Sequence, residues 1–280
     1  MGGNLFEYTR PIKQYEVDKT YYAVVSQFFF VMGLNKNQYA LVGSAGKKPG
    51  IDDLSGDLDI AVDKQALCNV LNCKYEDVLN VLKEALENAF DLEVKLTIGF
   101  NIVSIAFPIP YTKKEFVQVD LMLTDSIEWT KFASYSPDYR INESKYKSYY
   151  RNILLIAIAR NFIFSIAYNK DGEIKEMDRY ALDLSKGLKK TKYSYVGKKG
   201  QIRKTASKTV LEIITNDPEE LVHIILGPTF TIEDAKTYES LLAVLDNPKF
   251  NLFGGLKEQI LEDFKNALDL QFLPEPDLNI

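Results

Sequence analysis

Apolar residues in the first half of the chain follow two spacings, and each spacing is typical of one kind of element. Apolar side chains at helical spacing run through residues 11–34 and stop at Gly33, and a second such stripe runs through residues 74–89. Between them, residues 39–63 hold a short apolar run, a glycine-rich polar loop and another apolar run. The pattern predicts a helix, a strand, a loop, a strand and a second helix, in that order.

Three later runs have the composition and spacing of β-strands. Residues 92–100 and 102–107 are two such runs, with a turn signal at residues 99–101. Residues 116–123 alternate, which places one set of side chains on one face: Val117, Val119, Leu121 and Leu123. The other face takes Gln118, Asp120 and Met122. We therefore expect an α/β (α+β) fold with a mixed β-sheet and flanking helices.

Beyond residue 125 helical patterns dominate. Helices are expected at residues 145–167, 218–226, 231–246 and 255–270. Residues 193–204 are interpreted instead as a hairpin that turns between Gly197 and Gly200. This division predicts a core at residues 1–130 and a mainly helical C-terminal region at residues 131–280.

Two aspartates interrupt the second apolar run of residues 39–63. Asp57 and Asp59 are two positions apart, so on a strand their side chains project from the same face. Leu58 and Ile60 take the opposite face, which can be buried. Neighbouring carboxylates repel each other, and a shared divalent cation offsets that repulsion. Hard oxygen ligands suit Mg²⁺, so the pair predicts a magnesium site.

The order of these features resembles the signature of the DNA polymerase beta-like nucleotidyltransferase superfamily. Val42-Gly43-Ser44 is followed, after a twelve-residue spacer, by Asp57-Leu58-Asp59-Ile60. A third carboxylate in an apolar context comes later, at Asp120. The resemblance covers roughly residues 38 to 125. It implies a metal-dependent enzyme that transfers a nucleoside monophosphate from an NTP to a hydroxyl group and releases pyrophosphate.

The resemblance also implies roles for individual residues. Asp57, Asp59 and Asp120 would be the catalytic residues and the ligands of two Mg²⁺ ions, or of Mn²⁺ in their place. Asp120 would hold the ion nearer the acceptor. The expected nucleotide-binding residues are Gly43, Ser44, Lys47, Ser55 and Gly56. Lys48 is an alternative to Lys47 as the phosphate contact, and Gly43 with Ser44 on their own would indicate only a turn.

Composition excludes several other kinds of site. The chain has a single histidine, His223, on an apolar run where a packed core or boundary position is expected. One histidine gives little support to a Ser/His or Cys/His catalytic site or to a histidine-based zinc site. Cys68 and Cys73 are too few for a disulfide framework, which favours a cytoplasmic compartment. No apolar run is long enough to span a bilayer, so no membrane partner is expected.

The acceptor is predicted from local charge, because the net charge of −5 gives no overall attraction to nucleic acid. Residues 186–208 hold nine Lys and Arg residues and no acidic residue, which indicates a surface that follows a phosphate backbone, with tyrosines that stack on bases. The candidate nucleic-acid-binding residues are Lys198, Lys199, Arg203, Lys204, Tyr193 and Tyr195. An RNA or tRNA 3′ end is the expected acceptor.

Other functions stay open at this point. Residues 186–208 fit a solvated loop as well as they fit a phosphate-binding surface. The acceptor hydroxyl would then belong to a protein or a small molecule. A non-catalytic module that binds nucleotides or nucleic acid is a further alternative, although all three carboxylates of the signature are present.

Overall fold

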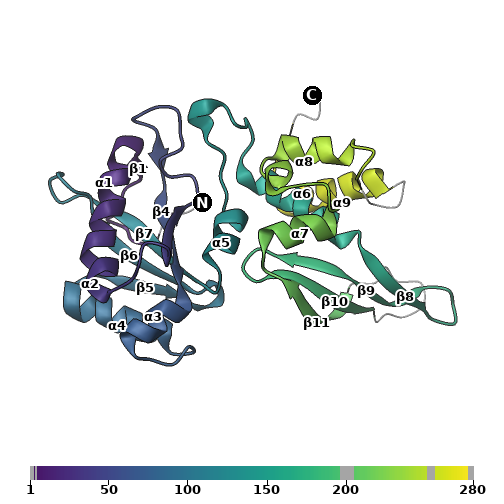
Figure 1. Ribbon diagram of the computed structural model, residues 1–280, viewed down its shortest axis with the longest axis horizontal. Helices are drawn as coiled ribbons and strands as arrows, with labels where there is room; N and C mark the ends of the chain where they lie inside the picture. Colours follow the sequence, from purple (N-terminus) through teal and green to yellow (C-terminus); the bar gives the residue numbers. More distant parts are fainter. Residues whose placement is uncertain (1–2, 4, 196–204, 251–255, 277–280) are drawn as a thin grey trace. The chain divides into compact units, whose positions relative to one another are not determined.

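A computed structural model describes residues 3, 5–195, 205–250 and 256–276, and the chain divides into two compact units at residues 1–145 and 146–280 (Figure 1). The sequence placed this division at residue 130. The first unit extends further because helix α5 (Ile127–Ala133) packs on its sheet, where Ile127 contacts Val42 and Ala61.

The first unit is built on a five-stranded mixed sheet, as the sequence predicted. Its strands lie in the order β2 (Tyr39–Val42), β4 (Asp57–Asp63), β7 (Phe116–Thr124), β6 (Ile102–Pro108) and β5 (Val94–Thr97). The central pair, β4 and β7, is parallel, and the other neighbours are antiparallel. A separate two-stranded sheet pairs β1 (Ile12–Lys13) with β3 (Leu54–Ser55).

The predicted first helix is confirmed as one helical run with an irregular middle. It consists of α1 (Gln14–Val24), a π-helical turn at Val25–Phe29 and α2 (Phe30–Met32). It ends at Gly33, whose φ of 85° is left-handed and suits glycine. The second predicted helix is α4 (Val78–Phe90), and a short helix, α3 (Lys64–Leu71), precedes it.

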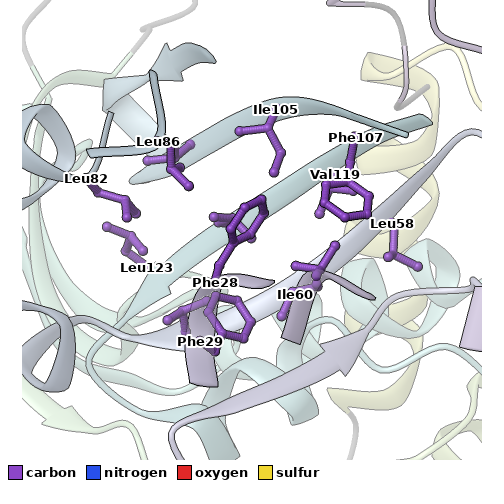
Figure 2. Close-up of a cluster of buried hydrophobic side chains, with 14 of the residues drawn as sticks. Phe28, Phe29, Leu58, Ile60, Leu82, Leu86, Ile105, Phe107, Val119 and Leu123 are labelled. Carbon is purple, nitrogen blue, oxygen red and sulfur yellow. The ribbon is translucent and has the colours of Figure 1, made fainter. Parts of the chain in front are cut away.

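One face of the five-stranded sheet forms the core of the first unit. Figure 2 shows Phe28 and Phe29 of the first helical run against the sheet, together with Leu82 and Leu86 of α4. The strands contribute Leu58, Ile60, Ile105, Phe107, Val119 and Leu123. The alternation predicted for residues 116–123 is confirmed, because its four apolar side chains are all at most 5% exposed. Asp57, Asp59 and Asp120 therefore project from the opposite face.

The second unit combines helices with an antiparallel sheet. Four strands lie in the order β11 (Thr205–Thr215), β10 (Gly187–Tyr195), β9 (Ile174–Asp183) and β8 (Ile163–Tyr168). The helices are α6 (Ser148–Arg160), α7 (Pro218–Ile225), α8 (Tyr238–Leu245) and α9 (Leu256–Leu270). The helices expected at residues 218–226 and 255–270 are confirmed, and so is the antiparallel pairing of the hairpin strands. The helix expected at residues 231–246 is shorter, because a 3₁₀ turn at Ile232–Ala235 precedes α8.

The sheet corrects the expectation of a mainly helical C-terminal region. Residues 145–167 were predicted as helix throughout, yet the helix ends at Arg160 and β8 begins at Ile163. A short apolar run has the same composition whether it is a buried helix segment or a strand, and here strand pairing with β9 decides. The predicted turn at residues 197–200 lies outside the described residues.

In the part of the chain that the structure describes, no helix has the length and apolar character needed to cross a membrane.

Candidate metal centre

The two central strands bring the three predicted carboxylates together. Asp57 and Asp59 lie on one face of β4, and the parallel register pairs Asp59 with Asp120 of β7. One carboxylate oxygen of each residue lies within 4.8 Å of the other two. All three side chains are half-buried, so they stay open to a ligand. A cluster of this kind can hold a metal ion.

Burial and mutual repulsion disfavour the charged forms of Asp57 and Asp59. Burial, followed by the charges of Asp57 and Asp120, raises the pKa of Asp59 to about 8. Burial and the charge of Asp120 also raise the pKa of Asp57. Among the described residues, no Lys or Arg forms a salt bridge with any of the three. The repulsion among the three carboxylates is therefore not offset by a basic side chain of the described residues, and a bound cation would offset it.

Gly43 allows the Gly-Ser loop to approach Asp59 closely. Its φ is +74°, a left-handed conformation, and a Cβ atom added there would lie 2.5 Å from Asp59 Oδ2. The Gly43 N–H donates to the carbonyl oxygen of Ser134 at 3.2 Å, which fixes the loop against the segment after α5. A residue with a side chain at position 43 would therefore displace the Asp59 carboxylate. Ser44 follows directly and is half-buried.

The two lysines of the loop each donate a hydrogen bond to a backbone carbonyl group. Lys47 Nζ donates to the Ser136 carbonyl oxygen at 2.8 Å and lies 5.1 Å from the centre of the Tyr135 ring. Lys48 Nζ donates to the Leu54 carbonyl oxygen. A phosphate bound beside the loop would compete with these carbonyl groups for the ammonium groups.

Ser55 and Gly56 lie at the entrance to β4. Ser55 is buried, and its hydroxyl accepts a hydrogen bond from Gln14 Nε2 at 3.2 Å. The backbone of Gly56 is in close contact with Gly3, which is itself left-handed at φ +87°. The backbone before Asp57 is thus held between the first helix and the start of the chain.

Other aspartates of the first unit have structural partners. Asp52 pairs with Lys13, and Asp53 accepts a hydrogen bond from the Gly50 N–H. Asp63 caps α3 through the Ala66 N–H, and Asp125 accepts from the Tyr75 hydroxyl. Their partners explain these carboxylates without a metal ion.

Sequence reasoning missed a role for Gln118. It assigned this residue to the same face as Asp120 but gave it no function. In the structure, Gln118 Nε2 donates to both carboxylate oxygens of Asp120, at 2.9 and 3.1 Å. The two-residue spacing on a strand was the available signal, because it places both side chains on one face.

The basic segment is described only in part. Lys198, Lys199, Arg203 and Lys204 lie outside the described residues, and Tyr195 is the last residue of β10. Tyr193 is 7% exposed and its ring packs under the guanidinium of Arg179, so the expectation of a ring open to a base is wrong there.

Two described lysines of the segment are neutralised by salt bridges: Lys189 pairs with Asp183, and Lys192 with Glu176. His223 is a further correction. It was expected at a core or boundary position, but it lies on the exposed side of α7, whose buried stripe is formed by Leu221, Val222 and Ile225.

No family model matches the chain, and no curated protein matches it. The carboxylate cluster is therefore the main indication of function.

The raised pKa of Asp59 predicts a pH-dependent gain in stability for Asp59→Asn without metal. The unfolded carboxyl titrates near pH 4, and the folded one near 8. Wild-type stability therefore falls as pH rises between these values, because only the unfolded state ionises freely. We expect the free energy of unfolding of the metal-free variant to exceed that of wild type by an amount that grows from pH 4 to pH 8 and reaches about 1–3 kcal/mol. Urea unfolding with EDTA measures this, and a difference that does not change with pH would contradict it.

Gly43→Ala should weaken metal binding beyond its effect on stability. Gly33→Ala is the matched control, because Gly33 is also left-handed but a Cβ there meets nothing within 4 Å. Both variants should lose about 1–2 kcal/mol of stability from the strained backbone. Only Gly43→Ala displaces Asp59, so only it should lower Mn²⁺ affinity, by about tenfold or more. Equal Mn²⁺ affinities of the two variants in a calorimetric titration would show that the loop does not constrain the carboxylate.

Proposed function

We propose that the chain is a metal-dependent nucleotidyltransferase that moves a nucleoside monophosphate from an NTP to an acceptor hydroxyl. The observation that carries the proposal is the convergence of Asp57, Asp59 and Asp120 from two parallel strands. The Gly43-Ser44 loop supports it, because its backbone approaches Asp59 at a position only glycine fits. The order of these parts along the chain matches the nucleotidyltransferase signature.

The donor set fits Mg²⁺. Three carboxylates supply hard oxygen ligands, and the raised pKa of Asp57 and of Asp59 reflects the repulsion that a cation would offset. When bound, two Mg²⁺ ions would supply Lewis-acid activation of the acceptor hydroxyl and neutralisation of the leaving pyrophosphate. Asp57 and Asp59 would hold both ions, and Asp120 the one on the acceptor side.

The chain's own groups would orient the reactants. The acceptor oxygen forms a bond to the α-phosphorus, the bond from that phosphorus to the bridging oxygen breaks, and pyrophosphate leaves. Asp120 lies beside Asp59 on the neighbouring strand, where its carboxylate can accept the hydroxyl proton. The Gly43-Ser44 loop and Lys47 would face the triphosphate, with Ser55 and Gly56 on the other side of the strand entrance.

Nucleic acid is the acceptor that we propose. The support is the charge of residues 186–208, which carry nine Lys and Arg residues and no acid in a chain of net charge −5. A flexible phosphate chain is bound by such a segment through neutralised phosphates and released counterions.

Transfer activity tests the proposal directly. The full chain with Mg²⁺ and labelled NTPs should move label onto RNA and release pyrophosphate. Asp57→Asn and Asp59→Asn should each abolish transfer, because a neutral amide is a poor Mg²⁺ ligand. Asp52→Asn is the matched control, since this carboxylate lies in the same loop region and pairs with Lys13.

Three other outcomes of this assay would each favour a different conclusion. Label on protein or on small metabolites would contradict a nucleic-acid acceptor but would support the proposed transfer activity. Nucleotide binding without pyrophosphate release would favour the non-catalytic module. Activity of Asp57→Asn or Asp59→Asn within a few-fold of wild type, with metal in excess, would rule out the carboxylate assignment.

The acceptor has its own test, a salt titration of RNA binding. A variant with Gln at Lys198, Lys199, Arg203 and Lys204 should bind RNA more weakly. The slope of log affinity against log salt should fall by about 0.7 for each lost phosphate contact. Nucleotide binding should not change, because the residues proposed to bind the triphosphate belong to the first unit. An unchanged slope would identify the segment as a solvated surface and exclude it as the acceptor site.

A further inference from the structure

The segment before β1 crosses the face of the sheet that carries the carboxylates. Gly3 contacts the backbone of Gly56, at the entrance to β4. The Leu5 N–H donates to Gln118 Oε1 of β7 at 2.9 Å. The Leu5 carbonyl accepts a hydrogen bond from Lys95 Nζ of β5. Gly3 and Leu5 therefore lie across the strands, next to the row that holds Asp57.

This segment is firmly attached. Phe6 is 2% exposed, and Lys95 Nζ lies 4.7 Å from the centre of its ring. The Tyr8 hydroxyl donates to Glu93 at 2.8 Å, and the Arg10 N–H donates to the Phe116 carbonyl at 2.8 Å. With these anchors the segment is a fixed wall beside the carboxylates.

The contact with Leu5 determines which way the Gln118 amide points. A backbone N–H can only donate, so it must face the oxygen of the side-chain amide. The NH₂ group of Gln118 is then directed to Asp120, where it donates to both carboxylate oxygens. Gln118 is 2% exposed, which leaves its amide little freedom to take another orientation.

Gln118 is the donor that orients Asp120. Ser104 of β6 is the cross-strand neighbour of Asp120 on the other side, but its buried hydroxyl makes no hydrogen bond in the described part of the chain. A donor to a carboxylate fixes its plane and so fixes the direction in which its free lone pairs point. Metal ligation requires that direction.

We propose that Gln118 is a positioning residue of the metal centre and that the Leu5 N–H sets its orientation. The proposal rests on the proposed function, because it assumes that Asp120 is a metal ligand. It makes the N-terminal segment a part of the site, through a relay from Leu5 to Gln118 to Asp120.

Mn²⁺ binding to the metal-free full chain tests the relay without any need for activity. Free Mn²⁺ followed by electron paramagnetic resonance gives the dissociation constant of each variant. Gln118→Met keeps the side-chain length and removes the donor, and it should weaken Mn²⁺ binding by about 10- to 100-fold. Ser104 flanks the same carboxylate, but Ser104→Ala removes no hydrogen bond, so the Mn²⁺ affinity of this variant should equal that of wild type.

A second pair of variants tests the backbone end of the relay. Leu5→Pro removes the N–H, whereas Leu5→Ala keeps it and shortens a side chain that is 41% exposed. Leu5→Pro should weaken Mn²⁺ binding by a few-fold, because the Gln118 amide is then no longer held in one orientation. Leu5→Ala should bind Mn²⁺ as wild type does. This pair also carries the test if Gln118→Met does not fold.

The outcomes distinguish the relay from the metal site. The relay is overturned if Gln118→Met binds Mn²⁺ as tightly as wild type while Asp59→Asn has lost it, or if Leu5→Ala and Leu5→Pro lose affinity equally. If wild type and Asp59→Asn bind Mn²⁺ with the same affinity, the metal centre itself is rejected, and the relay with it. In an active enzyme, Gln118→Met should lower kcat with little change in the KM for NTP, because Asp120 acts on the acceptor side.

Discussion

Mutual repulsion among three carboxylates is the constraint on which this site depends. The parallel register of β4 and β7 places Asp59 beside Asp120, and strand geometry puts Asp57 on the same face. Isolated from a cation, this arrangement favours protonation, as the raised pKa of Asp57 and of Asp59 indicates. The fold tolerates that cost because the opposite face of the same strands forms the core, where Leu58, Ile60 and Val119 are fully buried. The residues that build the core thus hold the carboxylates in place.

The surroundings of the cluster follow from this arrangement. α5 packs on the sheet next to β2, and Leu5 is hydrogen-bonded to Gln118 of β7 and to Lys95 of β5, so that fixed walls lie on two sides of the carboxylates. The Gly43 loop enters from the side of β2 and reaches Asp59 without a side chain between them. A site with fixed walls and converging ligands binds an ion with little reorganisation, which is what electrostatic catalysis requires.

Much of the first unit could be predicted from the sequence, whereas β8 and β9 of the second unit could not. Alternation on β7 and helical spacing on α1 and α4 are strong local signals, and the glycine at position 33 marks a helix end. The carboxylate faces followed from the same alternation. Strand order and register did not, because they depend on contacts between residues far apart in the chain. The contact of Leu5 with Gln118 spans 113 positions and has no local signal. β8 was assigned to a helix because its apolar run continues that of α6.

The position of a bound ion is the most direct test of the proposed metal centre. A crystal of the full chain, grown with Mn²⁺ and a non-hydrolysable NTP analogue, gives an anomalous signal at each Mn²⁺ ion. We predict a peak in contact with oxygens of Asp57, Asp59 and Asp120, with the triphosphate of the analogue beside the Gly43-Ser44 loop. A peak at another group of carboxylates, or an analogue bound with no Mn²⁺ at these three residues, would contradict the account.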